Sequence, residues 1–436
     1  MAGLDNLDQE LNVAIIGGGY AGMAAAVALA KRGIPVTVFE SARQLGGRAR
    51  GVVHQNTQLD NGQHLLLGCY KETLGLIEQV GGNLEQDFLR QPLQLDLHGH
   101  FALKAPHLPA PLHLLVALLR AQGLTWTERL SAARFMLTLR RMNFKLDSDI
   151  TVTELLARHR QSTALVQKLW EPLCIAALNT PVAIASARVL LNVLRDALNQ
   201  KRADSDMLIP RIDFTALLPK RAANYVIKHG GHVLTSCGVE NLRPLENGME
   251  ITTQRGSMTF SHVICATPPT TAAKLLRPIT RLDDVITQID ALQHQPIYTV
   301  YLQYPAYVRL PHPMLGLHQR ISQWLFDKGQ IAAQHGLIAS VISAEGLHQD
   351  LSQHELAQRV IAELRDEFGI TDSPLWFKVI AEKRATFACT PDLTRPNQQT
   401  PLPCLLLAGD YTKGDYPATL EGAVQSGLRC AELLSV

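Results

Sequence analysis

The chain has 436 residues, 46% of them hydrophobic, and its 41 basic and 39 acidic residues give a formal net charge of +2. This length exceeds one compact core, so we expect two or three structural units. The balanced charge, with no zinc-finger pattern and no basic run among aromatic residues, predicts no nucleic-acid partner and no metal site. Seven scattered cysteines without a C-x-x-C pair indicate buried thiols in a reducing compartment.

The first eleven residues are acidic and lack the basic-then-apolar pattern of a secretory signal. No stretch reaches the roughly 18 uncharged apolar residues that a membrane span needs. We therefore expect a cytoplasmic protein, and a peripheral position on the inner face of the membrane stays open.

A glycine-rich turn follows an apolar run at residues 12–16 (NVAII), which is typical of a strand buried on both faces of a parallel sheet. The turn reads Gly17-Gly18-Gly19-Tyr20-Ala21-Gly22, and the alanine-rich residues 23–31 predict a helix. Gly17 permits the tight turn, Gly19 lets the backbone approach a pyrophosphate, and Gly22 lets the helix pack on the strand. The helix start, at Tyr20 and Ala21, presents unpaired N–H groups to that pyrophosphate.

A second apolar strand, residues 35–39, ends on Glu40, which lies 18 residues past Gly22. That spacing is close to the roughly 20 residues expected for a carboxylate that accepts from a ribose hydroxyl. An acid at this place repels a 2′-phosphate, so NADP is disfavoured. A plain glycine turn followed by a solvated glutamate is the alternative, and the complete strand–turn–helix–strand–acid order argues against it.

The next segment separates FAD from NAD. Leu45-Gly46-Gly47-Arg48-Ala49-Arg50 follows Glu40 directly, and its glycines and arginine suit close approach to a second part of a long cofactor. This E-x₅-G-G-R continuation resembles the flavin amine oxidase and phytoene desaturase superfamily. The resemblance implies that FAD is the cofactor, that Gly47 and Arg48 lie near its pyrophosphate, and that Gly62 contacts it. An ordinary basic turn is the alternative.

The C-terminal region resembles the flavin end of the same superfamily. An apolar run at 404–408 (CLLLA) ends in Gly409-Asp410, and a helix is predicted from the PATLEGA segment at 417–423 to about residue 434. The resemblance implies that Gly409 and Asp410 contact the ribityl or pyrophosphate region, and that the N–H groups near Thr419 and Leu420 face flavin N1 and O2. The helix dipole would then stabilise the anionic reduced flavin by about 0.3–2 kcal/mol. The alternative roles are those of turn and cap residues.

The same resemblance implies that Val239 meets the adenine through its backbone and that the strand at 262–267 closes the cofactor domain. We therefore expect an α/β fold in which a Rossmann-like FAD-binding domain carries an inserted α+β substrate domain. The FAD-binding domain is discontinuous, with residues 10–90, 210–290 and 385–436. The substrate domain consists of a helical part, 91–209, and a sheet part, 291–384, whose alternating strands are predicted at 297–302, 323–326 and 337–342.

Two further strings narrow the family: residues 59–68 (LDNGQHLLLG) and 169–181 (LWEPLCIAALNTP). Together with GDYT at 409–412 and PATLEGA at 417–423, they resemble the hydroxysqualene dehydroxylase family of bacterial hopanoid synthesis over nearly the whole chain. One departure is Tyr411, where tryptophan is expected, and both side chains are flat and aromatic.

The resemblance implies an FAD-dependent oxidoreductase that reductively removes the allylic hydroxyl of hydroxysqualene to give squalene. Its substrate is then a hydrophobic isoprenoid, and an association with the synthases of the squalene pathway is expected. The alternatives are an isoprenoid desaturase or amine oxidase of the same superfamily, or a non-catalytic FAD-containing protein that binds prenyl lipids. An amine oxidase typically needs a flavin-site lysine and an aromatic cage, neither of which the sequence identifies.

Loss of a hydroxyl requires a proton donor, and Asp60 and His64 are the candidates because they follow the cofactor motifs closely. The alternatives are that Asp60 only anchors its loop and that His64 bonds to the backbone. A water-insoluble substrate also needs an entry route. Residues 109–145 place an apolar run before a series of arginines, which fits docking on anionic lipid or, equally, a buried helix hairpin that lines the cavity.

Overall fold

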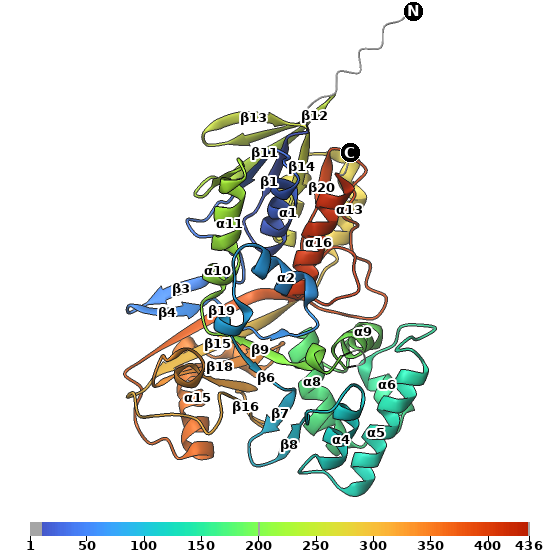
Figure 1. The fold of residues 1–436 in the computed structure, drawn as a ribbon, viewed down its shortest axis with the longest axis vertical. Coiled ribbons are helices and arrows are strands. Elements are labelled where there is room, and N and C mark those ends of the chain that lie inside the picture. Colours follow the sequence, from blue (N-terminus) through green and yellow to red (C-terminus); the bar gives the residue numbers. More distant parts are fainter. Residues whose placement is uncertain (1–10, 199–200, 435–436) are drawn as a thin grey trace, which may run out of the picture.

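The computed structural model describes residues 11–198 and 201–434. Its upper part in Figure 1 is built on a five-stranded parallel sheet of order β10-β2-β1-β14-β20. The strands are β1 (Val13–Ile16), β2 (Val36–Phe39), β10 (His232–Leu234), β14 (His262–Cys265) and β20 (Leu405–Leu407). Three distant stretches of sequence therefore meet in one sheet, as the predicted discontinuous cofactor domain requires.

Burial on both faces explains why β1 is continuously apolar. Val13 and Ile15 pack with helices α1 (Tyr20–Lys31), α11 (Pro219–Lys228) and α16 (Leu420–Leu433) on one face. Ala14 and Ile16 face the antiparallel meander β11 (Val239–Leu245), β12 (Gly248–Thr253) and β13 (Gly256–Phe260) on the other face. Figure 1 shows the helices and the meander on opposite sides of the strands. Helices α12 (Pro269–Leu276) and α13 (Asp283–Asp290) follow β14.

The second part is built on a seven-stranded sheet of order β19-β15-β18-β17-β16-β7-β8, in which only the β16–β7 pair is parallel among the described residues. Its strands are β7 (Gln94–Leu97), β8 (Phe101–Lys104), β15 (His294–Gln303), β16 (Met314–Gly316), β17 (Trp324–Asp327), β18 (Leu337–Ser343) and β19 (Trp376–Phe387). Helix α15 (Gln353–Phe368) packs on one face. The three predicted strands lie in β15, β17 and β18.

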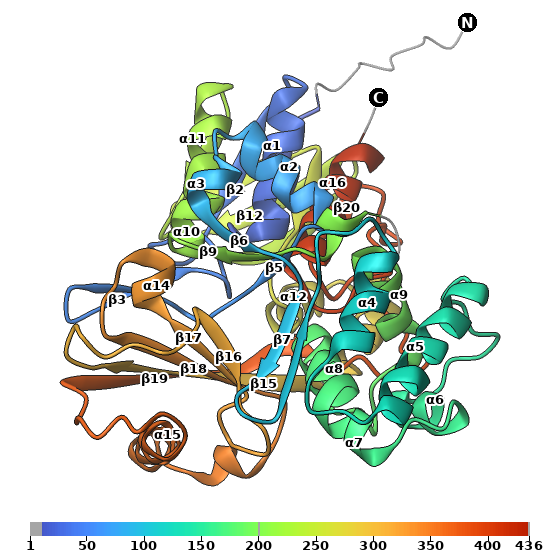
Figure 2. The same ribbon diagram turned by 60° about the horizontal axis from the view of Figure 1, so that its bottom comes forward.

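The stretch expected to be helical also contributes strands. Leu95, Leu97, Phe101 and Leu103 alternate around a turn at Gly99, and their buried side chains join β7 and β8 to the sheet. Residues 91–209 were expected to form a helical part, but they begin with the strands β7 and β8 and end in β9 (Met207–Pro210). The helices follow, grouped on one side of the sheet in Figure 2: α4 (Leu112–Arg120), α5 (Trp126–Arg141), α6 (Val152–Arg158), α7 (Thr163–Leu165), α8 (Glu171–Leu178) and α9 (Ala187–Leu198).

Asn179 fastens this helical group to the sheet. It ends α8 in the left-handed conformation, with φ of 48°. Its side-chain amide donates to Pro296 O (3.2 Å) and Thr386 Oγ1 (2.9 Å), and its oxygen accepts from Ala344 N (2.6 Å). One buried side chain thus joins a helix end to β15, to β19 and to the residue that follows β18.

Shorter elements connect the two parts. A small sheet of order β5-β9-β6, the hairpin β3–β4 and several short helices lie between them. Their bounds are β3 (Gly51–His54), β4 (Thr57–Asp60), β5 (Leu66–Leu67), β6 (Phe88–Gln91), β9 (Met207–Pro210), α2 (Lys71–Gln79), α3 (Leu84–Asp87), α10 (Phe214–Leu217) and α14 (Lys328–Ala332). Across residues 11–198 and 201–434, no helix is both long and apolar enough to cross a membrane.

Candidate functional site

A single cavity of about 880 Å³ extends from the carboxyl ends of β1 and β2 to the seven-stranded sheet. Ligands of open parallel sheets bind at this edge. Fourteen of the sequence-predicted site residues line it: Gly17, Gly19, Tyr20, Ala21, Glu40, Gly47, Arg48, Gly62, His64, Val239, Gly409, Asp410, Thr419 and Leu420. Gly22 and Asp60 lie behind the wall.

The glycine turn forms a narrow backbone cradle. Gly17 has φ of +111°, and its N–H donates to Phe39 O at 2.8 Å, which fixes the turn to β2. A methyl group added at Gly22 would lie 2.0 Å from Gly17 O, so this glycine permits α1 to pack on the strand. A methyl group at Gly19 would meet only Gly47 Cα, at 3.9 Å, and would project into the cradle. The backbone around Gly19 and the backbone around Gly47 therefore leave room between them for a pyrophosphate.

Glu40 lies at the end of β2, directly beside this cradle. Its Oε2 accepts from Gly18 N and its Oε1 from Ala42 N, both at 2.8 Å. These bonds hold the carboxylate at the cavity wall, where Val239 and Gly238 also lie. The arrangement fits an adenosine ribose whose hydroxyls donate to a carboxylate.

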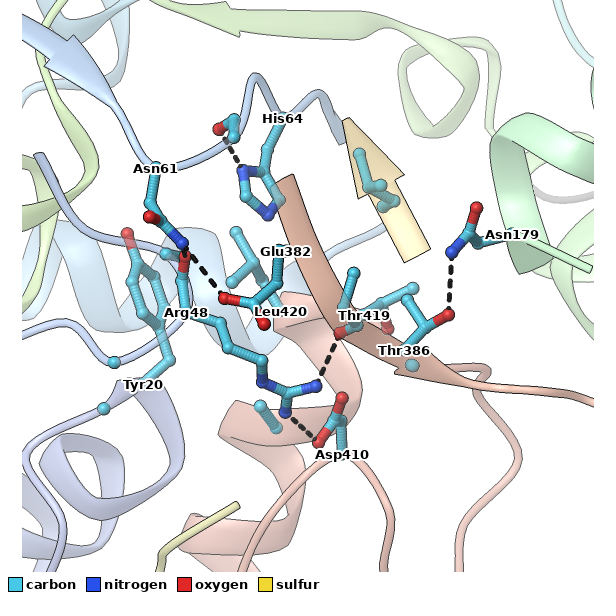
Figure 3. Close-up of a pocket in the computed structure, with 18 of the residues that line it drawn as sticks. Tyr20, Arg48, Asn61, His64, Asn179, Glu382, Thr386, Asp410, Thr419 and Leu420 are labelled. Carbon is cyan, nitrogen blue, oxygen red and sulfur yellow. Dashed lines mark hydrogen bonds and ion pairs between the residues drawn. The ribbon is translucent and has the colours of Figure 1, made fainter. Parts of the chain in front are cut away.

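Arg48 and Asp410 bring the two ends of the chain together (Figure 3). The guanidinium donates to Asp410 Oδ1 at 2.5 Å and to Ala385 O at 2.6 Å. Burial alone would lower the pKa of Arg48, but the adjacent Asp410 carboxylate raises it, so the side chain stays cationic. A buried cation beside the glycine cradle suits a pyrophosphate.

The start of α16 closes this end of the cavity. Thr419 caps the helix, and its Oγ1 accepts from Gly422 N at 3.1 Å. Gly409 has φ of +154°, and a side chain there would strike the Tyr411 ring, so the turn before the helix requires glycine. Arg395 holds the intervening loop by donating to the carbonyls of Asp410, Gly414 and Tyr416. The helix N-terminus therefore meets the cavity in a fixed orientation.

Beyond this polar end, the cavity continues as an apolar arm. One wall is the seven-stranded sheet and the other is formed by α8 and α9. The apolar residues on the sheet side are Leu95, Ile297, Met314, Trp324, Phe326 and Val341, and those on the helix side are Leu173, Ala176, Ala177, Val193, Leu194, Ala197 and Leu198. Such a lining accepts a long hydrocarbon and excludes water.

The two predicted proton donors differ in position. His64 lines the cavity, and its Nδ1 donates to Gly62 O at 2.7 Å. Burial lowers the pKa of His64, so the neutral ring offers only Nε2, an acceptor, to the cavity. Asp60 accepts from Phe214 N at 2.9 Å, and burial raises its pKa to about 7 despite the nearby charge of Lys328. Its geometry matches the anchoring alternative, and its catalytic role stays a prediction.

Comparison with known proteins decides the family. The sequence model of flavin containing amine oxidoreductases matches residues 20–435, which is nearly the whole chain. The chain belongs to this flavin oxidoreductase family. The predicted superfamily is thereby confirmed, and the cofactor class is a flavin.

Similar proteins refine the picture of this flavin oxidoreductase. The hydroxysqualene dehydroxylase of Rhodopseudomonas palustris is 30% identical over 97% of the chain and 98% of its own length. The zeta-carotene desaturase of Solanum lycopersicum is 23% identical over 96% of the chain and 80% of its own length. Cyclohexylamine oxidase of Brevibacterium oxydans, a solved structure, covers 97% of the chain with a TM-score of 0.69 at 16% identity. The resemblance to hydroxysqualene dehydroxylases and the α/β fold class are confirmed.

Sequence reasoning missed several residues that the oxidoreductase brings to this cavity. Asn61 and Glu382 both line it, and Asn61 Nδ2 donates to Glu382 Oε2 at 3.3 Å (Figure 3). Arg384 and Thr386 line it as well. Glu382, Arg384 and Thr386 are spaced by two along β19, but the sequence analysis predicted no strand there, and Ala385 between them also lines the cavity.

Proposed function

We propose that this oxidoreductase uses FAD to remove the allylic hydroxyl of hydroxysqualene and so forms squalene. The observation that carries the proposal is the single cavity in which a dinucleotide cradle opens directly into a long apolar arm. The name of the relative from Rhodopseudomonas palustris supports the choice of substrate. A hydrocarbon chain with one polar group suits an arm that is apolar along most of its length.

The residues of the cavity fit FAD in particular. Glu40 would hold the adenosine ribose, Arg48 the pyrophosphate, and the N-terminus of α16 the flavin ring. Gly19 and Gly47 leave the space that the pyrophosphate needs. When bound and reduced, the cofactor supplies a hydride.

The protein's own part is to bind, orient and desolvate the substrate. The sheet and the α8–α9 wall would keep water from the allylic cation that forms when the hydroxyl leaves. Asn179 supports this function indirectly, because its three hydrogen bonds hold the end of α8 against the sheet.

The deciding experiment is anaerobic incubation of the photoreduced, FAD-loaded protein with hydroxysqualene, followed by analysis of the extracted lipids. We expect squalene in amounts stoichiometric with reduced FAD during a single turnover. No squalene with full FAD occupancy would discard the proposal and favour a non-catalytic protein that binds prenyl lipids.

Oxidative desaturation is the second candidate, and the zeta-carotene desaturase relative supports it. The two reactions differ in the direction of electron flow. Incubation of the oxidised protein with zeta-carotene would bleach the flavin under anaerobic conditions if the chain were a desaturase. A bleached flavin together with no squalene in the first experiment would replace the proposal.

We propose also that the substrate arrives from an anionic lipid surface on which α4 and α5 dock. Exposed apolar side chains there (Leu112, Trp126, Leu130, Leu137) lie among arginines, and Glu128 is the only acidic residue between positions 112 and 145. An apolar face with a cationic border is the pattern of interfacial helices. A peripheral position on the inner face of the membrane follows from this proposal, and an association with the squalene-pathway synthases stays a prediction.

A further inference from the structure

We propose that Glu382 donates the proton to the departing hydroxyl, an assignment that rests on the proposed function and deepens it. The residue lies on β19, and its register partner on β15 is Ile297, whose own partner on β18 is Ser343. Paired residues of antiparallel strands point to the same face, and all three line the cavity. The carboxyl therefore faces the apolar arm from its sheet wall.

Glu382 differs from the other carboxyl groups of the lining. The described lining residues include three acids: Glu40, Glu382 and Asp410. Backbone N–H groups hold Glu40, and Arg48 pairs with Asp410, so both are committed to the cofactor end. Glu382 accepts one bond, from Asn61 Nδ2 at 3.3 Å, on Oε2. Its other oxygen has no hydrogen-bond partner within residues 11–198 and 201–434, and is free to meet a substrate hydroxyl.

The remaining proton-bearing side chains of the cavity are poorer donors. Burial raises the pKa of both Tyr70 and Tyr416, so these phenols retain their protons. The hydroxyl of Tyr20 donates to Phe214 O at 3.0 Å. His64 presents an acceptor nitrogen to the cavity, and Asp60 lies behind the wall.

Figure 3 shows Glu382 beside Asn61 and near His64 and Leu420, at the start of α16. Its strand partner Ile297 belongs to the apolar lining, so Glu382 lies where the polar end of the cavity meets the apolar arm. A substrate whose chain fills the arm would bring its polar group to this boundary. The carbon–oxygen bond then breaks with both electrons on oxygen, which takes the Glu382 proton and leaves as water. FAD, when bound and reduced, would supply the hydride that the carbon needs, and solvent would return a proton to the Glu382 carboxylate.

Three variants test the proposal. Glu382→Gln keeps the size and the bond from Asn61 but cannot donate an acidic proton, whereas Glu382→Asp keeps the acid. Lys383→Gln is the matched control, because the next side chain of the strand is exposed and does not line the cavity. Circular dichroism, thermal unfolding and FAD content would verify that each variant folds and binds its cofactor.

Single-turnover formation of squalene is the first measurement. A general acid contributes about 10²–10⁴-fold, so we expect Glu382→Gln to lower the rate by at least about 100-fold. Glu382→Asp should restore part of the loss, and Lys383→Gln should match the wild type. A Glu382→Gln rate within about threefold of the wild type would overturn the assignment. The proposed function itself fails only if the wild type forms no squalene.

The pH profile distinguishes an acid from a structural residue. We expect the single-turnover rates of the wild type and of Glu382→Gln to depend differently on pH, because only the wild type carries an ionisable group at this position. The charged groups near Glu382 do not mimic this behaviour. Arg48 stays cationic beside Asp410, and burial lowers the pKa of His64 and of His294. The same pH dependence of the rate in both proteins would contradict the proposal.

Ligand binding gives a readout without turnover. The amine analogue of hydroxysqualene carries an ammonium in place of the hydroxyl, and the Glu382 carboxylate would pair with it. In calorimetric titrations of the oxidised protein, Glu382→Gln should bind this amine at least about tenfold more weakly. Binding of squalene, which lacks the polar group, should not change. Equal binding of the amine by both proteins would place Glu382 away from the reacting carbon and overturn the proposal.

Discussion

Gly19 precedes α1 and Gly22 lies in its first turn. A methyl group added at each of them meets different surroundings. At Gly19 the nearest atom is 3.9 Å away, and its φ of −80° suits alanine. We predict that Gly19→Ala changes the free energy of unfolding by less than about 1 kcal/mol. The methyl group would occupy the space of the pyrophosphate, so FAD affinity should fall by about tenfold or more. Fluorescence titration of the apoprotein and thermal unfolding would measure the two effects.

Gly22→Ala is the matched variant. Its methyl group would lie 2.0 Å from Gly17 O, so α1 must move away from the strand. Overpacking of this kind costs about 1–3 kcal/mol, and unfolding of the apoprotein should report it. Equal stability of the two variants, or normal FAD affinity in Gly19→Ala, would contradict the assigned roles.

The buried carboxyl group of Asp60 should make the free energy of unfolding depend on pH. Its pKa is raised by burial to about 7, against about 3.9 in an unfolded chain. The folded state therefore retains this proton as pH rises through the acidic range, while the unfolded state releases it. This contribution to stability is fully present below about pH 4 and is lost by about pH 7. We predict that Asp60→Asn makes the decline of stability between these limits shallower.

Urea unfolding of wild type and Asp60→Asn at several pH values would test this prediction. The asparagine can still accept from Phe214 N, so the local fold should persist. Burial lowers the pKa of Lys328 and the nearby charge of Asp60 raises it, so the pKa of Lys328 should fall further in Asp60→Asn. A lowered lysine pKa makes stability rise with pH, which would make the decline in the variant shallower still. Parallel curves for the two proteins would refute the environment described for Asp60.

At the scale of elements, we predict that the protein binds anionic lipid through the α4–α5 hairpin (residues 112–141). The Trp126 side chain is 66% exposed, and Leu130 and Leu137 share its face of α5. We predict that the protein floats with phosphatidylglycerol vesicles at low salt and less at high salt, because screening weakens attraction of the arginines. Replacement of Trp126 and Leu137 by serine should reduce flotation at both salt concentrations.

Ile227→Ser provides the control, since this exposed residue lies on α11 beside the parallel sheet, far from the hairpin in Figures 1 and 2. It should float as the wild type does. The absence of wild-type flotation at either salt concentration would refute docking of the hairpin on lipid.

Elements with a strong local pattern could be predicted from sequence. The alanine-rich segment after the glycine turn became α1, and the PATLEGA segment became the start of α16. The β7–β8 hairpin was missed, because its strands are short and their partner, β16, lies more than 200 residues away. Pairing between distant strands has no local signature.

At the scale of the whole molecule, the order of motifs predicted an α/β flavoprotein with a discontinuous cofactor sheet. The division into residue ranges stays a prediction, although β1, β2, β10, β14 and β20 all fall within the expected cofactor segments. The site was predicted less completely. Asp60 and His64 were chosen because they neighbour a motif in the chain, whereas Glu382 reaches the same cavity only through the pairing of β19 with β15.

The order of the parallel strands along the chain also determines when the cofactor site can form during biosynthesis. Translation produces β1 and the glycine turn almost at once, but β20 and α16 emerge only after the intervening strands and helices. Until then, α1 lacks α16, one of the two helices that pack beside it, and Arg48 lacks Asp410. If the cofactor is FAD, as proposed, a nascent chain can hold at most its adenosine half. The site for the flavin half would be complete only after β20 and α16 have been made, so we expect a chain that ends before residue 385 to be colourless after purification.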